Sequence, residues 1–241
     1  MADVTLTDLR TRPVRTTNYR VVLIDDHPLF AESLDLALSR SGYDVRRAEI
    51  PDTPTRTATL LAQSCRRGPS VVLLDLDLGR FGDGSRLIRP LVQIGATVVV
   101  LTAETDRARW GQCISEGAAT VLSKTGALDT VLATLGRIEE GLPVLAAGER
   151  EGLLASWRVC QAEQQALRSR LDRLTVREAE VLGGLARGRT VREIATRSFV
   201  SEATVRTQVK SILGKLCVSS QLAAVGLARS ASWRPPVEAH R

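Results

Sequence analysis

Cysteine, lysine and long apolar runs are all scarce in this sequence. The four cysteines lie far apart in a chain of 241 residues and form neither a CxxC pair nor another metal-ligand spacing. That pattern argues against zinc sites and disulfides and predicts reduced thiols. The longest aliphatic run, near residues 98–101, is too short to cross a bilayer, and the N-terminus lacks the apolar core of a signal peptide. We therefore expect a cytoplasmic protein with no membrane partner.

Charge is divided unevenly along the chain. Hydrophobic residues make up 44% and charged residues 25% of the sequence, values typical of a globular protein with one large domain or two ordinary ones. Residues 1–145 hold 17 Lys and Arg against 18 Asp and Glu, whereas residues 146–241 hold 16 against 9. The basic second part favours a nucleic-acid or acidic-substrate partner. From charge alone, a merely solvated helical surface is an equally good interpretation.

Strand-like and helix-like segments alternate through the first part. The segments at 21–24 and 71–74 are aliphatic without alternation, as in buried parallel strands. The strand-like segments lie near residues 20–24, 44–49, 71–75, 97–101 and 119–122. The intervening helices are expected near residues 29–40, 55–66, 84–94, 105–116 and 127–140. Five such repeats predict an α/β flavodoxin-like fold, a five-stranded parallel sheet with helices on both faces.

Two of these strands end in acidic residues. The run 71–74 leads into Asp75, and the run 21–24 leads into Asp25 and Asp26. Since ligands of open α/β sheets bind at the carboxyl ends of the strands, the three carboxylates are expected in one crevice. Like charges repel there unless a cation holds them. The sequence therefore predicts a Mg²⁺ site with one carboxylate free to react.

The second part reads as a linker followed by a small helical domain. Residues 1–19 are expected to form a flexible arm, residues 20–145 the α/β domain, and residues 233–241 a tail. Residues 146–173 have a helical composition and a heptad spacing of apolar positions. The seam consists of Leu153, Trp157, Cys160, Gln164, Leu167, Leu171 and Leu174. It predicts either a two-chain coiled coil or a linker helix packed against its own α/β domain.

Residues 174–232 read as four short helices without strands. Thr175 with Glu178 forms a capping-box pattern for the first helix, and Ser201 caps the third. The apolar residues of the third helix fall at helical spacing and are expected in the core. They are Val205, Val209, Ile212, Leu213 and Leu216. Arg206, Thr207 and Lys210 fall on another, exposed face.

Residues 20–140 resemble the receiver domains of two-component response regulators, the CheY-like fold. The match rests on Asp25 and Asp26 followed by His27-Pro28, on Asp75, on Thr102 in VVVLTAE and on Lys124 in VLSKTG. The resemblance implies that Asp75 accepts a phosphoryl group from a sensor histidine kinase. It also implies that Asp25, Asp26 and Asp75 bind Mg²⁺, while Thr102 and Lys124 contact the phosphoryl oxygens. Lys124 is one of three lysines beside 30 arginines, which supports a specific role.

Three features depart from the receiver pattern. The loop after Asp75 lacks the usual proline and is one residue longer than usual. Val121 occupies the position of the usual aromatic switch residue, and Asp77 adds a carboxylate two positions beyond Asp75. We expect Asp75 to be phosphorylated, but we do not expect the signal to travel through an aromatic rotamer.

Residues 174–230 resemble the LuxR-type helix-turn-helix domain of the NarL/FixJ class nearly throughout. The resemblance implies binding to double-stranded DNA as a homodimer, with RNA polymerase as a further candidate partner. It places Arg206, Thr207 and Lys210 near bases or phosphates, and Arg192, Arg197, Ser201 and Thr204 on the DNA backbone. Family members usually have His at position 208 and Gly at position 217, where this chain has Gln208 and Cys217.

These features predict a DNA-binding transcription regulator controlled by phosphorylation, not an enzyme. The alternative is a receiver and helix-turn-helix protein that phosphorylation does not control. A third interpretation is a phosphatase of the haloacid-dehalogenase type, because Asp75 and Asp77 form a DxD motif. The order of the other acids and the C-terminal helix-turn-helix argue against it.

Overall fold

The computed structural model describes residues 20–48 and 70–235. The expected N-terminal arm, the helix expected near 55–66 and residues 236–241 lie outside the described residues. The chain divides into two compact units, Met1–Trp157 and Arg158–Arg241, which are described separately.

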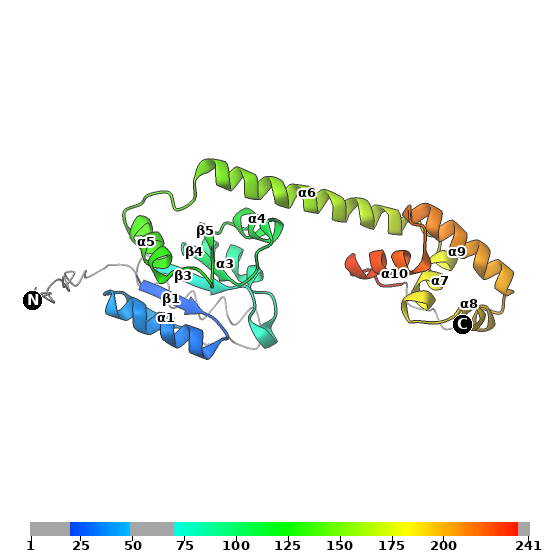
Figure 1. Cartoon of the computed structure of the whole chain (residues 1–241), viewed down its shortest axis with the longest axis horizontal. Helices are drawn as coiled ribbons and strands as arrows, with labels where there is room; N and C mark the ends of the chain where they lie inside the picture. Colours follow the sequence, from blue (N-terminus) through cyan, green and yellow to red (C-terminus); the bar gives the residue numbers. More distant parts are fainter. Residues whose placement is uncertain (1–19, 49–69, 236–241) are drawn as a thin grey trace, which may run out of the picture. The chain divides into compact units, whose positions relative to one another are not determined.

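The first unit is built on a parallel sheet (Figure 1). Its strands run in the order β2-β1-β3-β4-β5, and every pairing is parallel. The strands are β1 (Arg20–Ile24), β2 (Asp44–Arg47), β3 (Ser70–Asp75), β4 (Thr97–Thr102) and β5 (Thr120–Ser123). The predicted flavodoxin-like fold is confirmed. β3 lies at the centre, and all six of its residues are buried.

Alternate residues of the strands contribute to two apolar layers, one on each face of the sheet. Val72 and Leu74 pack on one face of the sheet, and Val71 and Leu73 on the other. The first layer is covered by α3 (Ile88–Gln93) and α4 (Arg107–Ser115), and the second by α1 (Pro28–Arg40) and α5 (Leu128–Glu139). Two covered faces explain why β1, β3 and β4 read as continuous aliphatic runs.

The helix expected over residues 84–94 is only partly α-helical. Gly84–Leu87 forms a 3₁₀ turn (η2), and α3 begins at Ile88. Pro90 lacks a backbone N–H, so it cannot donate the hydrogen bond that would extend an α-helix back through the turn. A second 3₁₀ turn, η1 (Gly79–Phe81), occupies the long loop after β3.

The linker helix α6 (Ala147–Asp172) contributes to the core of both units. Leu153 is 1% exposed and lies in an apolar cluster of the first unit, whereas Leu171 is 3% exposed and lies in the cluster of the second unit. Between them, Gln164 is exposed. Intramolecular packing therefore uses both ends of the heptad seam. The two-chain coiled coil stays a prediction.

The second unit consists of the C-terminal part of α6 and four further helices. These are α7 (Val176–Ala186), α8 (Val191–Arg197), α9 (Glu202–Leu216) and α10 (Gln221–Ser230). The predicted core positions Val205, Val209, Ile212 and Leu216 are all buried, and Leu213 packs against them half-buried. Thr175 and Thr190 each form a complete capping box, and Ser201 caps α9.

Membrane-spanning character is weak in the described residues. No single helix there is long and apolar enough to cross a bilayer. The pair α9 and α10, bent by 55°, passes the test of length and composition only when taken together.

Candidate phosphoacceptor pocket and nucleic-acid interface

The strand ends bring the predicted acids together. Asp25, Asp26, His27 and Asp75 each offer a ligand atom, and these four atoms lie within 4.8 Å of one another. The side chains of Asp25 and Asp75 are 1% and 3% exposed, whereas that of Asp26 is 27% exposed. β1 and β3 are neighbours in register, so the acids that follow them meet at one edge of the sheet.

Lys124 enters the same cluster from the end of β5. Its Nζ lies 2.6 Å from Asp75 Oδ2 and 2.8 Å from Asp25 Oδ2, and it sits 4.8 Å from the centre of the Phe30 ring. The contact with Asp75 is a hydrogen bond, and that with Asp25 is an ion pair. Asp25, Asp75 and Lys124 therefore form the charged centre of the pocket.

The charges of Asp75 and Lys124 respond differently to this environment. Burial raises the pKa of Asp75, and the contact with Lys124 offsets that effect only in part. Burial alone would lower the pKa of Lys124, but its contacts with Asp25 and Asp75 outweigh burial and raise it. A single ammonium group thus leaves the three carboxylates incompletely neutralised.

The negative charge that Lys124 leaves unneutralised in this cluster suits a hard divalent cation. Asp25 Oδ2 and Asp26 Oδ1 are buried oxygen atoms without a hydrogen-bond partner among the described residues. His27 Nδ1 lies 2.8 Å from Asp26 Oδ1 and 3.4 Å from Asp25 Oδ1. Mg²⁺ prefers carboxylate, carbonyl and water oxygens. The residues present therefore fit the predicted metal, with Asp25, Asp26 and Asp75 as the acidic donors.

Thr102 lines the open side of the acid cluster. It ends β4, is 2% exposed, and its Oγ1 accepts the backbone N–H of Glu104 at 3.0 Å. The pocket has a volume of about 410 Å³. Its lining residues are His27, Phe30, Asp75, Asp77, Thr102, Ala103, Glu104 and Lys124. Asp75, Thr102 and Lys124, predicted from three separate strand ends, thus share one cavity.

The loop after Asp75 passes very close to the acids. Gly79 has φ +53°, and a Cβ there would lie 2.5 Å from Asp26 Oδ2. A Cβ on Gly84 would lie 2.1 Å from the carbonyl oxygen of Asp75. Asp77 and Asp83 form an antiparallel bridge that closes the loop between them. Glycine rather than proline therefore shapes the longer loop, since only a residue without a side chain fits at these approaches.

Val121 provides no aromatic switch in this pocket. It pairs with Val100 in the sheet and is 7% exposed within the apolar layer under α4. The only phenyl ring among the described pocket residues belongs to Phe30 of α1, beside Lys124.

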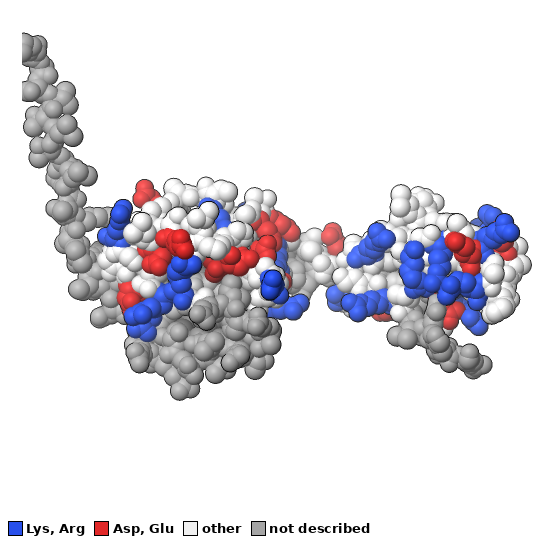
Figure 2. All heavy atoms as spheres, turned by 90° about the horizontal axis from the view of Figure 1, so that it is seen from below, with Lys and Arg blue, Asp and Glu red and all other residues white. Residues whose placement is uncertain are grey.

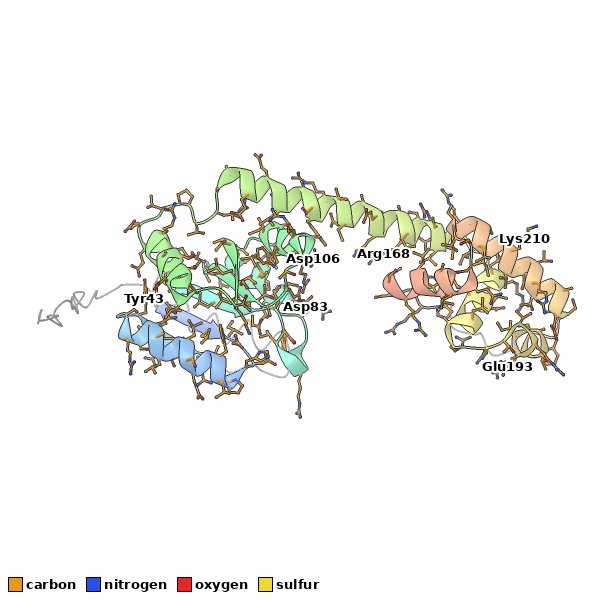
Figure 3. The ribbon with its side chains drawn as sticks, in the orientation of Figure 1. Tyr43, Asp83, Asp106, Arg168, Glu193 and Lys210 are labelled. Carbon is orange, nitrogen blue, oxygen red and sulfur yellow. The ribbon has the colours of Figure 1, made fainter. Side chains whose placement is uncertain are left out.

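In the second unit, α9 presents the predicted basic face. Arg206, Thr207 and Lys210 are exposed, and Lys210 projects from the outer side of α9 (Figure 3). Arg206 also forms a weak ion pair with Glu202 one turn earlier, at 3.3 Å. Ser201 accepts the backbone N–H of Thr204 at 3.1 Å and fixes the start of the helix. Basic side chains gather over this unit (Figure 2).

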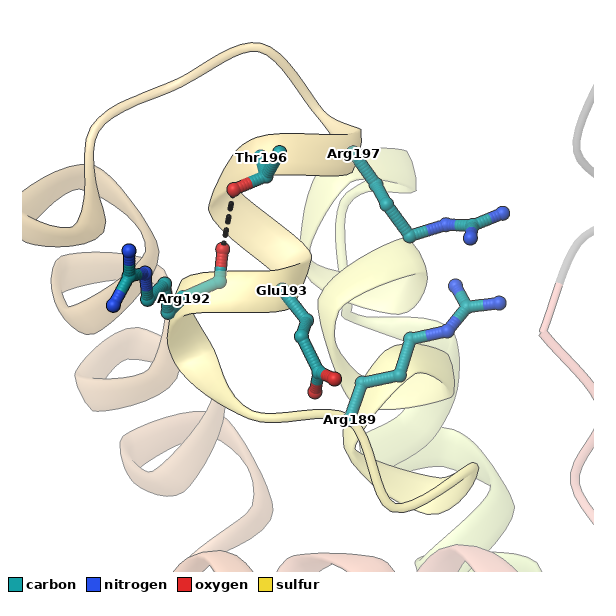
Figure 4. A pocket seen from close by; sticks show the side chains of 5 residues that line it. All are labelled: Arg189, Arg192, Glu193, Thr196 and Arg197. Atoms are coloured by element: carbon teal, nitrogen blue, oxygen red, sulfur yellow. Dashed lines mark hydrogen bonds between the residues drawn. The ribbon is translucent and has the colours of Figure 1, made fainter.

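A hollow of about 320 Å³ lies along α8 (Figure 4). Arg189 and Arg197 extend toward the same side of it, and Arg192 lies on the other side of Glu193 (Figure 4). The carboxylate of Glu193 is already engaged by the backbone N–H of Thr190 at 2.7 Å. Two of the predicted backbone-contacting residues, Arg192 and Arg197, therefore line one basic concavity.

A buried carboxylate holds α9 against α7. Glu178 accepts hydrogen bonds from Lys215 Nζ and Ser211 Oγ, both at 2.6 Å, and from the backbone N–H of Thr175 at 2.7 Å. Burial would raise the pKa of Glu178, but these donors outweigh burial and lower it to about 2. Sequence analysis identified Glu178 only as a capping residue. Its spacing from Ser211 and Lys215 exceeds 30 residues, so local patterns carry no signal for this network.

Comparisons with known proteins agree with both halves of the chain. The response regulator receiver domain family matches residues 21–136, and the family of bacterial regulatory proteins of the luxR type matches residues 172–228. A nitrate/nitrite response regulator protein homolog of Haemophilus influenzae is 30% identical over 211 residues, covering 86% of this chain and 95% of the relative. The chain belongs to the response regulators with a LuxR-type domain. As a member of this family it is a transcription regulator.

Two further relatives cover similar lengths of this response regulator. The probable transcriptional regulatory protein NarL of Mycobacterium tuberculosis is 30% identical over 208 residues, covering 86% of this chain and 91% of the relative. Among solved structures, the response regulator ChrA of a heme-sensing two-component system has 27% identity and a TM-score of 0.43, covering 90% of this chain and 98% of that one.

Proposed function

We propose that this response regulator is phosphorylated on Asp75 and that phosphorylation controls DNA binding through α9. The observation that carries the proposal is the shared pocket of Asp75, Thr102 and Lys124 beside the acids Asp25 and Asp26. A sensor histidine kinase is the expected phosphodonor. Because the proposed partner of the second unit is chromosomal DNA, the proposed location is the cytoplasm.

The proposed reaction is a phosphoryl transfer to the Asp75 carboxylate. An Asp75 oxygen attacks the phosphorus of a phosphohistidine or of a small acyl phosphate, a new P–O bond forms, and the bond from phosphorus to the donor breaks. A phosphohistidine whose second ring nitrogen carries a proton leaves as neutral histidine, and an acyl phosphate leaves as a carboxylate. No net proton is required from the pocket when the donor is an acyl phosphate.

Each neighbour of Asp75 has a part in this step. Lys124 already contacts the attacking carboxylate, so its ammonium is positioned to pair with a phosphoryl oxygen once the acyl phosphate forms. Thr102 lines the same cavity, and its hydroxyl is proposed to donate a hydrogen bond to another phosphoryl oxygen. Mg²⁺, held by Asp25, Asp26 and Asp75, would supply the charge neutralisation that a transferring phosphoryl group needs.

The second unit would bind double-stranded DNA with α9 in the major groove. Arg206, Thr207 and Lys210 are proposed to contact bases or nearby phosphates. Arg192, Arg197, Ser201 and Thr204 are proposed to hold the DNA backbone. A homodimer is the expected DNA-bound form, and RNA polymerase is the expected target of the bound regulator.

Acetyl phosphate with Mg²⁺ tests the phosphorylation step. Intact mass should show one added phosphoryl group on wild type and none on Asp75→Asn. Asp129→Asn is the matched control, because Asp129 is an exposed aspartate at the start of α5 and its change removes the same charge. Asp129→Asn should be modified like wild type.

A second candidate function is DNA binding that phosphorylation does not control. Val121 and the longer loop after Asp75 favour it, since they depart from the usual switch. Absence of added mass on wild type, together with tight binding to a DNA fragment selected from random sequence, would support this alternative over the proposal.

A further inference from the structure

The first turns of α6 pack against α4 at a glycine. A Cβ on Gly111 of α4 would lie 2.0 Å from the carbonyl oxygen of Leu153 and 2.9 Å from the Cβ of Trp157. Leu153 is 1% exposed and shares an apolar cluster with Cys113 and Ile114 of α4. In Figure 1 the N-terminal half of α6 runs beside α4. Only glycine fits at this crossing, so the two helix backbones are in direct contact.

The N-terminal end of α4 is tied to the loop that follows Asp75. The Arg109 guanidinium on α4 forms an ion pair with Asp83, which is the residue that bridges to Asp77 at the base of that loop. Arg109 is 20% exposed, so water screens this pair only in part. Asp83 also accepts the backbone N–H of Ser85, which holds its carboxylate in place. Asp83 and the helix cap Asp106 are labelled in Figure 3.

The loop that follows Thr102 is tied to the same end of α4. Thr102 Oγ1 accepts the N–H of Glu104, and the Glu104 carbonyl oxygen accepts the indole N–H of Trp110 at 2.9 Å. The Glu104 carboxylate lies 3.6 Å from Arg109 Nε. The loops that follow Asp75 and Thr102 are therefore bonded to the side chains of two consecutive α4 residues, Arg109 and Trp110. These two residues immediately precede Gly111.

We propose that α4 relays phosphorylation to the linker helix: a phosphoryl group on Asp75 shifts α4 through Arg109 and Trp110, and the shift releases residues 147–157 of α6 from Gly111. This inference rests on the proposed function of Asp75. It gives Arg109 the role of a positioning residue and replaces the aromatic route that Val121 cannot provide.

The tight contact between α4 and α6 at Gly111 determines how α6 responds to a shift of α4. A helix that touches another at backbone atoms cannot move closer or rotate without a clash, and packed contacts rearrange between discrete states rather than deform smoothly. When Thr102 turns toward a phosphoryl oxygen, its hydrogen bond moves the Glu104 backbone. The Glu104 carbonyl in turn moves the indole of Trp110. The contact with Leu153 then breaks rather than stretches.

Hydrogen exchange of the full chain measures the release directly. Amides of residues 150–157 should be protected in unmodified wild type and exchange about tenfold faster after acetyl phosphate and Mg²⁺ have modified Asp75. Arg109→Gln should still gain the phosphoryl group by intact mass, yet show no change of exchange on modification. Asp83→Asn should behave like Arg109→Gln, because it removes the other partner of the same ion pair.

Gly111→Ala tests the crossing without phosphorylation. Its methyl group clashes with the Leu153 carbonyl, so α6 should exchange about tenfold faster even without donor. Gly136→Ala in α5 is the matched control, because a Cβ at Gly136 meets nothing within 4 Å and both changes raise helix propensity. Gly136→Ala should exchange like wild type.

The outcomes separate the relay from the proposed function. If wild type takes up a phosphoryl group but its exchange is unchanged, the relay is wrong and the proposed function stands. The relay is also overturned if Arg109→Gln responds like wild type, or if Gly111→Ala exchanges like Gly136→Ala. If wild type takes up no phosphoryl group at all, the proposed function fails and the relay fails with it.

Discussion

The Nζ of Lys124 lies 2.6 Å from Asp75 Oδ2, so the only ammonium among the described pocket residues rests on the proposed nucleophile before any phosphoryl group arrives. β5 and β3 carry these two residues to the same edge of the sheet although 49 positions separate them in the chain. The pair therefore has two functions. It neutralises a buried carboxylate in the unmodified protein, and it places a cation where the acyl phosphate will develop charge.

Lys124→Gln should slow phosphorylation of Asp75 by acetyl phosphate about tenfold or more, because the variant lacks the charge that pairs with the phosphoryl oxygens. The rate of mass increase under saturating Mg²⁺ measures this effect. Lys210→Gln removes an exposed lysine from α9 and serves as the control. Equal rates for Lys124→Gln and Lys210→Gln would remove Lys124 from the proposed reaction.

Asp75→Asn should stabilise the metal-free receiver unit by about 1 kcal/mol. Burial raises the pKa of Asp75, which means that the fold disfavours the charged form, and asparagine removes that charge at neutral pH. Mg²⁺ should raise the melting temperature of wild type and have much less effect on Asp75→Asn, since one of three acidic donors is lost. Calorimetry with and without Mg²⁺ measures both effects. A variant less stable than metal-free wild type would contradict this electrostatic account.

Glu178 should make the helical unit sensitive to acid. Its pKa of about 2 lies below the ordinary value of 4.5, so the stability that it contributes is present above about pH 4.5 and is lost as the pH falls toward 2. We expect Glu178→Gln to cost on the order of 2 kcal/mol at neutral pH, because it leaves Lys215 without a carboxylate partner. Urea unfolding at pH 7 and pH 3 measures the difference, which should shrink at the lower pH. Glu180 on the same helix forms an ion pair with the exposed Arg177, so Glu180→Gln should change the free energy of unfolding little.

Cys217→Gly should stabilise the helical unit by about 1 kcal/mol. Cys217 ends α9 with φ 57° and ψ 45°, a left-handed conformation that a residue with a Cβ adopts only at a cost. Cys217→Ala keeps that cost and should leave the midpoint of chemical unfolding nearly unchanged. If Cys217→Gly and Cys217→Ala had the same unfolding midpoint, the left-handed conformation at the end of α9 would not lower the stability of the helical unit.

The residues of α9 should differ in how they affect DNA binding. Arg206→Gln should cost about 1–3 kcal/mol on the preferred sequence if Arg206 reads a base, and it should relax specificity there. Lys210→Gln should weaken binding to all sequences alike and reduce the salt slope by about 1 if Lys210 contacts a phosphate. Arg168→Gln, in the linker helix α6, is the control for general loss of positive charge. Fluorescence anisotropy over a range of salt concentrations separates the three cases.

Much of the fold could be predicted from the sequence, because its signals are local or periodic. Continuous aliphatic runs identified β1, β3 and β4, and Thr175 and Ser201 marked helix starts that the structure confirms. The acid cluster followed from one rule about strand ends, applied to Asp25, Asp26 and Asp75. The left-handed residue at the end of α9 was also predictable, since Cys217 stands where a glycine is usual.

The connections between distant residues could not be predicted in the same way. Arg109 and Asp83 are 26 positions apart, and nothing in their local sequence distinguishes that ion pair from other exposed charges. The heptad seam predicted a packed helix but did not show that Leu153 packs in the receiver cluster and Leu171 in the other unit. The requirement for glycine at position 111 could not be predicted either, because it depends on the α6 backbone that approaches Gly111.

The most direct test of phospho-control is DNA affinity measured on samples whose Asp75 modification is known from intact mass. Wild type treated with acetyl phosphate and Mg²⁺ should bind its selected DNA fragment about tenfold more tightly than untreated wild type, and Asp75→Asn should not respond to the same treatment. Equal affinity of fully modified and unmodified wild type would contradict the account.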